Sequence, residues 1–126
     1  MRKNKFKAWD KVNKCMYLDN FFIDRNGLLF TENDCYDLSE SPGISTVLGA
    51  ILIEYIGRND KNDKEIYNGD IILDKNNRKH IVEWEDSYTG FSPFIYQVDD
   101  SGDWISPDEV EVIGNKYENT ELAIDI

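Results

Sequence analysis

Turn-forming residues recur at short intervals through the second half of this 126-residue sequence, at Asn68–Gly69, Asp74–Asn77, Gly90 and Asp99–Asp103. The segments between them are too short for a long helical period, and they are rich in β-branched and aromatic residues, which favour strands. We therefore predict strands over Ile71–Leu73, Arg78–Trp84, Phe91–Val98 and Val110–Ile113. Closely spaced strands are typical of a small barrel, which removes its own sheet edges. The sequence thus predicts a mainly β fold with a small barrel in its C-terminal half.

The first half of the sequence predicts two β-hairpins. Lysines at positions 3, 5 and 7 alternate with Asn4, Phe6 and Ala8, which is the period of a strand with one solvated face. Turn-forming residues at 10–13 separate this strand from a second extended run at 14–18. The second hairpin is centred on Asn26–Gly27, a dipeptide that takes the positive φ angles of a tight turn, between the apolar runs Phe21–Ile23 and Leu28–Phe30.

The best internal boundary is the polar segment at residues 31–46, which contains Pro42–Gly43 and is interpreted as a loop. The apolar run at 47–55 fits either a buried strand or a short helix, and its β-branched residues favour the strand. We predict an N-terminal unit rich in β-hairpins over residues 1–56 and the barrel over residues 57–126. The alternative is that both halves form one compact domain.

The negative charge of the chain lies almost entirely in its last third. The net charge is −11, and residues 81–126 contain 12 acidic side chains against the single cation Lys116. Such a surface repels a phosphate backbone, which disfavours direct nucleic-acid binding even through the basic first strand. The simplest role of this charge is to maintain solubility, although opposite charge at the two ends also permits head-to-tail pairing of subunits.

The N-terminal sequence lacks the apolar core of a signal peptide. The longest apolar stretch, Val47–Ile53, is interrupted by Gly49 and is too short to span a bilayer. We therefore predict a cytoplasmic protein that has no membrane association, with both cysteines, Cys15 and Cys35, in the reduced state. A disulfide between the two cysteines is the less favoured alternative.

Several segments resemble the YopX-like family of phage and prophage proteins. Residues 55–72 are similar to the family's central signature, in which Tyr-Thr-Gly is followed by Asp-Lys-Asn-Gly-Lys-Glu-Ile-Tyr and then Gly-Asp-Ile. Residues 5–10 resemble the family's opening, and residues 112–119 resemble its closing stretch. The resemblance thus covers nearly the whole chain in order. Two residues depart from the pattern: Ile56 replaces the threonine, and Asp63 replaces the glycine before the second lysine.

This resemblance implies an SH3-like barrel in the C-terminal half of a phage-encoded accessory protein, made in a bacterial host, whose function is uncharacterised. It implies no catalytic residues. The signature contains the turn-forming and strand-starting residues Asp60, Asn62, Tyr67, Gly69 and Asp70. Since Asp and Asn accept hydrogen bonds from nearby backbone N–H groups, we interpret these residues as architectural, with a ligand-binding loop as the alternative. Aspartate tolerates a positive φ angle, so the turn at Asp63 is expected to form.

No motif in the sequence indicates catalysis, a cofactor or a metal. His80 is the only histidine, and no nucleophile is nominated as its partner. The segment from Asp60 resembles a calcium loop, but Lys64 and Glu65 occupy positions that require an oxygen ligand and a glycine. The acidic turn Asp99–Asp103 is interpreted as a solvated hairpin tip rather than a cation site. We therefore predict a protein that is not an enzyme and that has no cofactor.

Aromatic residues beside the predicted turns provide the best candidate for a binding surface. Some aromatic side chains must fill the barrel core, but Tyr88, Phe94, Tyr96 and Trp104 are placed to line a groove for an extended peptide. The leading hypothesis is a non-enzymatic protein-interaction module with an unidentified partner, for which a host protein is one candidate. Homo-oligomers are also compatible with this hypothesis. The alternative is an acidic nucleic-acid mimic that occupies a host DNA-binding protein.

Overall fold

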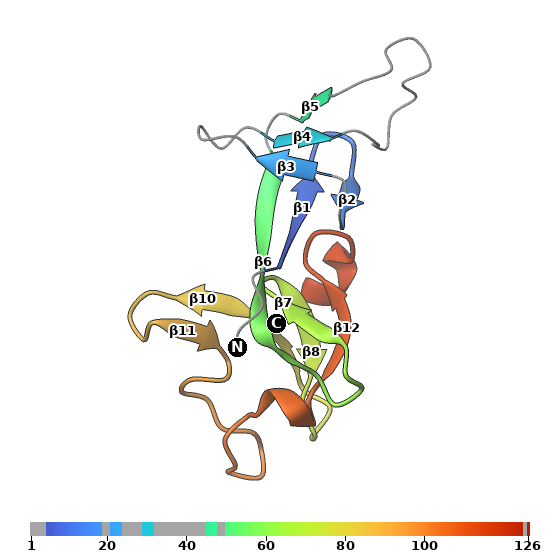
Figure 1. Ribbon diagram of the computed structural model, residues 1–126. Helices are drawn as coiled ribbons and strands as arrows, with labels where there is room; N and C mark the ends of the chain where they lie inside the picture. The colour runs from blue at the N-terminus through green and yellow to red at the C-terminus, as the bar shows by residue number, and fades with distance from the viewer. Residues whose placement is uncertain (1–4, 19–20, 24–28, 32–44, 48–49, 125) are drawn as a thin grey trace. The chain divides into compact units, whose positions relative to one another are not determined.

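The computed structural model of the chain describes residues 5–18, 21–23, 29–31, 45–47, 50–124 and 126 (Figure 1). The chain forms an N-terminal unit, Phe6–Ile53, and a C-terminal unit that comprises Glu54–Ile126 and the start of the chain up to Lys5. Regular structure is almost entirely β, so the predicted fold class is confirmed. Within the described ranges, the helices are two short 3-10 turns, and neither is long and apolar enough to cross a membrane.

The first predicted hairpin is confirmed in the N-terminal unit. Strands β1 (Phe6–Asp10) and β2 (Cys15–Tyr17) pair antiparallel, with Ala8 opposite Tyr17. The carboxylate of Asp10 closes the turn, because its Oδ1 accepts the backbone N–H groups of Val12 at 3.0 Å and Asn13 at 3.1 Å. The predicted faces of β1 are wrong in part. Phe6 is exposed, whereas the consecutive residues Ala8, Trp9 and Asp10 are all buried, so both faces of the strand are covered at this end.

The state of Cys15 differs from the prediction. The residue lies on β2 beside the small buried cluster of Ala8 and Tyr17, and it is disulfide-bonded, so the prediction of a reduced thiol is wrong for it. Cys35, the other cysteine of the chain, lies outside the described residues.

The second hairpin is confirmed as strands β3 (Phe21–Ile23) and β4 (Leu29–Thr31), which pair antiparallel, with β5 (Ser45–Val47) on the other side of β4. The predicted turn at Asn26–Gly27 and most of the polar segment 31–46 lie outside the described residues. The choice of strand over helix for the following apolar run is confirmed, because β6 extends over Ala50–Asn59.

The C-terminal unit contains most of the remaining strands. The second part of β6 pairs with β7 (Glu65–Tyr67). A three-stranded antiparallel sheet has β8 (Asp70–Leu73) between β12 (Glu111–Asn115) and β9 (Lys79–Ile81). A separate hairpin pairs β10 (Glu83–Glu85) with β11 (Gly90–Ser92), and the two 3-10 turns are η1 (Pro107–Glu109) and η2 (Thr120–Ala123). The sheets are curled and form a half-barrel, while closure into the SH3-like barrel stays a prediction.

Two predicted strands of this unit require correction. The segment Arg78–Trp84 is divided at Val82, so that β9 pairs with β8 and β10 pairs with β11. The strand predicted over Phe91–Val98 is wrong, because β11 ends at Ser92 and a turn follows. Pro93 has no backbone N–H and therefore cannot continue the hydrogen-bond ladder.

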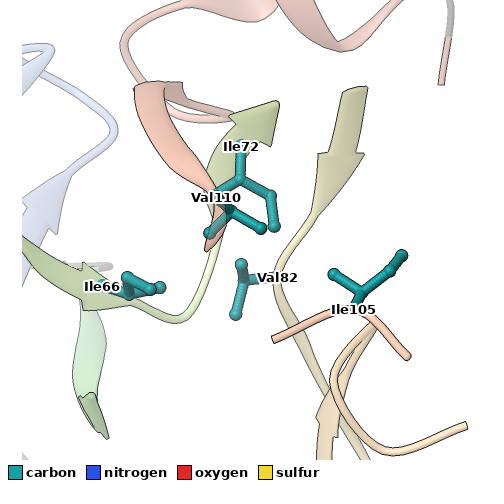
Figure 2. Packing of buried hydrophobic residues seen from close by; sticks show 5 residues of the cluster. All are labelled: Ile66, Ile72, Val82, Ile105 and Val110. Atoms are coloured by element: carbon teal, nitrogen blue, oxygen red, sulfur yellow. The ribbon is translucent and has the colours of Figure 1, made fainter. Parts of the chain in front are cut away.

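The core of the C-terminal unit is formed by five β-branched side chains that come from distant parts of the sequence. They point toward one another in Figure 2 and are at most 3% exposed: Ile66, Ile72, Val82, Ile105 and Val110. Ile72 lies at the centre of β8, which is the middle strand of its sheet. Val82 lies at the division between β9 and β10, so the core joins both sheets.

Candidate interaction surface

The β10–β11 hairpin provides the framework of the surface, and it projects from the rest of the C-terminal unit (Figure 1). Trp84 lies opposite Phe91, and Glu83 lies opposite Ser92, so these two pairs face opposite sides of the hairpin. The rings of Trp84 and Phe91 meet edge to face at 5.2 Å between centroids. Phe91 packs against the core, whereas Trp84 is 45% exposed.

The residues after β11 fold back over the side of the hairpin that carries Gly90. A Cβ atom on Gly90 would lie 2.5 Å from Cγ2 of Ile95, so Ile95 packs directly against the glycine. The next residue, Tyr96, stacks on Tyr88 with ring centroids 4.7 Å apart and an interplanar angle of 21°. Both tyrosines are exposed, at 38% and 59% respectively. We refer to this pair as the tyrosine stack.

The four aromatic residues proposed from the sequence have different positions. Tyr88 and Tyr96 form the tyrosine stack, while Phe94 packs against the core cluster. Trp104 is 63% exposed and forms a β-bridge with Val98. We refer to Tyr88, Tyr96 and Trp104 as the aromatic surface. Trp84 is a further exposed ring on the hairpin and was not among the four predicted surface residues.

An open pocket of about 310 Å³ lies on the side of the hairpin that carries Glu83 and Ser92. Its interior is largely polar. The side-chain amide NH2 of Gln97 donates to Oγ of Ser92 at 3.4 Å. The Glu83 carboxylate is 3.4 Å from Nζ of Lys116. The lining residues are His80, Ile81, Glu83, Ser92, Pro93, Gln97 and Ile126.

His80 is held by a buried carboxylate. Its Nε2 lies 2.8 Å from Oδ2 of Asp74, whose side chain is 3% exposed. Burial opposes ionisation of Asp74, but hydrogen bonds from His80 and from the backbone N–H groups of Arg78 and Asn76 outweigh it and lower the pKa of the carboxyl group. In the described part of the chain, no group of three or more His, Cys, Asp and Glu residues is arranged to hold a metal ion.

Because the pKa of Asp74 is lowered in the folded protein, acid should destabilise the fold through this residue. The stabilisation is complete above the unfolded-state value of about 3.9, and it is lost as the pH falls through the lower folded-state pKa. We expect Asp74→Asn to flatten the decline of stability below about pH 4, as measured by thermal unfolding between pH 7 and pH 2. A decline identical to that of the wild type would contradict this expectation.

The family signature begins with a turn organised by Asp60, which is 5% exposed. Oδ1 of Asp60 accepts the backbone N–H groups of Asn62 at 2.8 Å and Lys64 at 2.9 Å. Oδ2 accepts the N–H of Val112 on β12 at 2.9 Å. One carboxylate therefore closes the turn and also joins it to a strand 52 residues away in the sequence.

The turns that begin at Asp74 and Asp99 repeat this hydrogen-bond pattern. In each turn, the leading aspartate accepts N–H groups from the second and fourth residues that follow it. The third residue has a positive φ angle in all three turns, at 64° for Asp63, 64° for Asn77 and 83° for Gly102. Asp63 thus adopts the conformation expected where the family has glycine.

The rest of the signature also contributes to architecture. Oδ2 of Asp70 accepts the N–H of Tyr67 at 2.7 Å. Gly69 has a φ angle of 93°, and a Cβ atom there would lie 2.7 Å from Cε2 of Tyr117. Burial, together with the adjacent Glu65 carboxylate, raises the pKa of Tyr67 to about 12. The contacts of these residues support the architectural interpretation over the ligand-binding loop.

Ion pairs join the acidic last third to the basic residues that precede it. Lys75 contacts the carboxylates of Asp99 and Asp103, and Nε of Arg78 lies 2.8 Å from Oδ2 of Asp100. The acidic turn Asp99–Asp103 therefore has lysine and arginine as its counter-ions. Two further pairs are longer, Arg58 with Asp108 at 3.5 Å and Lys61 with Glu111 at 3.9 Å.

The sequence model of the family described as YopX protein matches residues 5–123. The chain is similar in structure to protein EF1440 from Enterococcus faecalis, with 20% identity, a TM-score of 0.57 and coverage of 97% of this chain and 99% of that chain. It is also similar to yopX from Bacillus subtilis, with 23% identity, a TM-score of 0.53 and coverage of 97% and 98% respectively. No curated protein sequence matches the chain. At these identities, the two solved structures show a shared fold alone.

Proposed function

Because this chain belongs to the YopX family, as its signature residues predicted, we propose that it is a phage- or prophage-encoded accessory protein that binds another protein and is not an enzyme. The single observation that supports this proposal is the exposure of large rings on the C-terminal unit. Tyr88, Tyr96 and Trp104 are 59%, 38% and 63% exposed. Tyrosine and tryptophan are enriched among the residues that carry most of the binding energy in protein interfaces.

The backbone segments that carry Tyr96 and Trp104 lie side by side. Tyr96 precedes Gln97, whose carbonyl oxygen accepts the backbone N–H of Ile105 at 3.3 Å. Trp104 therefore lies beside the segment that carries the tyrosine stack. A partner that covers this surface removes apolar ring area from water while the phenolic and indole polar groups remain able to form hydrogen bonds.

The proposal that the protein is not an enzyme is supported by the contacts of its best catalytic candidate. The Asp74 carboxylate that holds His80 also accepts two backbone N–H groups of its own turn. The His80–Asp74 contact therefore joins β9 to the preceding turn. This structural role explains the geometry of the two side chains without a catalytic role.

Replacement of Tyr88 or Trp104 by alanine should weaken capture of the partner at least about tenfold, because truncation of a central aromatic residue commonly removes 2 kcal/mol or more of binding energy. The partner is first identified by affinity capture from host lysate with mass spectrometry, and its affinity for each variant is then measured with purified proteins. Ile124→Ala is the matched control, since Ile124 is 77% exposed and lies outside the aromatic surface. Equal affinities for all variants would reject the surface. Light scattering on the same samples measures self-association.

The alternative of an acidic nucleic-acid mimic is less well supported. A mimic needs an array of free carboxylates, whereas Asp99, Asp100 and Asp103 are paired with Lys75 and Arg78. The two proposals differ in their salt dependence. A complex that dissociates steeply between low and moderate salt favours the mimic, whereas a complex held mainly by aromatic rings loses affinity only modestly as salt rises.

A further inference from the structure

We infer that the pocket lined by Glu83 and Gln97 receives the guanidinium group of an arginine side chain from an extended segment of the partner. This inference rests on the proposed function and names the chemistry of what the surface binds. The pocket volume of about 310 Å³ is at the lower end for small-molecule sites. It therefore suits one side chain better than a larger ligand.

The pocket offers hydrogen-bond acceptors. The Glu83 carboxylate is 48% exposed, and its lysine partner lies 3.4 Å away with a side chain that is 36% exposed. A pair of this kind is weak in water, so an incoming cation can replace Lys116. The side-chain amide NH2 of Gln97 donates to Ser92, so its Oε1 oxygen can accept a hydrogen bond from a ligand. A guanidinium group has five N–H donors in one plane and can bond to both oxygens at once.

Charge complementarity favours a cation over an anion or a neutral group. Glu83 is the acidic side chain among the described residues that line the pocket, and this lining includes neither lysine nor arginine. His80 also lines the pocket, but its Nε2 is engaged by the Asp74 carboxylate. The surrounding field therefore attracts basic segments and increases their rate of encounter.

The two acceptors of the pocket favour arginine over lysine. A guanidinium group is planar and weakly hydrated, and its N–H groups form a fixed fork that suits the Glu83 carboxylate and Oε1 of Gln97, which both line the pocket. An ammonium group is a compact and strongly hydrated point charge. Lysine retains more of its hydration, so it should bind less tightly at the same position.

The test uses the full chain labelled with ¹⁵N and titrated with N-acetylarginine amide, whose uncharged counterpart is N-acetylcitrulline amide. We expect saturable shifts of the Gln97 side-chain amide with the arginine probe and none with citrulline. Glu83→Gln should weaken arginine binding about tenfold, since it removes the carboxylate while it preserves side-chain size. Lys116→Gln should strengthen binding severalfold, because it removes the competing cation. Glu109→Gln, on η1 and outside the pocket, should change nothing.

Equal binding of arginine and citrulline, tighter binding of N-acetyllysine amide, or an unchanged affinity in Glu83→Gln would each overturn the inference. The spectrum of each variant reports its folding at the same time. Failure here is distinguishable from failure of the proposed function. A partner that is lost by Tyr88→Ala but captured equally by Glu83→Gln would leave the aromatic surface intact and remove the arginine site. Saturable arginine binding by a chain that captures no partner would leave the arginine site intact and remove the proposed protein-binding function.

Discussion

Alanine in place of Ile72 is expected to reduce the free energy of unfolding by about 3–5 kcal/mol, which is a large part of the stability of a domain of this size. Ile72 is fully buried on the central strand β8, where it packs with Val82 and Val110. Truncation loses the transfer free energy of three carbon atoms and leaves a cavity that a β-sheet core fills poorly. Urea titration followed by circular dichroism and tryptophan fluorescence measures the change.

The matched controls separate the cavity from a general sensitivity to substitution. Ile72→Val removes one methylene group and should cost about 1 kcal/mol. Ile124→Ala makes the same chemical change as Ile72→Ala at a position that is 77% exposed, so its effect should be within about 0.5 kcal/mol. A cost for Ile72→Ala no greater than that for Ile72→Val would contradict the assignment of Ile72 to the core.

Asp60→Ala is expected to have the second-largest effect, about 3 kcal/mol. The substitution removes the acceptor of three backbone N–H groups, those of Asn62, Lys64 and Val112. A buried donor left without a partner costs about 1–3 kcal/mol, and the N–H groups nearest the surface recover part of this from water. The same urea titration measures the loss.

Asp60→Asn provides a graded comparison. Its Oδ1 still accepts the two N–H groups of the turn. Its amide NH2 group, which is a donor, replaces the oxygen that faces the N–H of Val112, so that bond is lost. The free energy of unfolding of Asp60→Asn should therefore lie between those of the wild type and Asp60→Ala. The lost contact is the one to the N–H of Val112 on β12. Asp100→Ala is the surface control, because the Asp100 side chain is 57% exposed and pairs with the exposed Arg78. An Asp60→Ala variant as stable as this control would refute the proposed role.

The sequence predicted the hairpins well because turn chemistry is local. Asp10 and the aspartates at 60, 74 and 99 each bond to backbone groups within four residues, so their effect can be read from a short window. The common pattern of the last three turns was also present in the sequence, as an aspartate followed three positions later by Asp, Asn or Gly, which are residue types that tolerate a positive φ angle.

The surface residues were harder to predict because their partners are set by tertiary folding. Strand period cannot show that Trp9 is buried while Phe6 is exposed, since β1 is covered on both sides at one end only. The stacking of Tyr96 on Tyr88 depends on the chain folding back after Pro93, where a longer strand was expected. Such contacts join residues whose positions follow from the path of the backbone rather than from any local pattern.

Val82 anchors the start of the β10–β11 hairpin to the central sheet. Its backbone N–H donates to Asp70 at 2.8 Å, and its carbonyl accepts from Gly69 at 2.6 Å, so it is fixed to the turn before β8. The strand on one side of Val82 pairs with β8, and the strand on the other side carries Trp84. A slip of one residue in the central sheet would turn every side chain of the hairpin to its opposite face. The register of β9 on β8 therefore also determines which face of the β10–β11 hairpin carries Trp84.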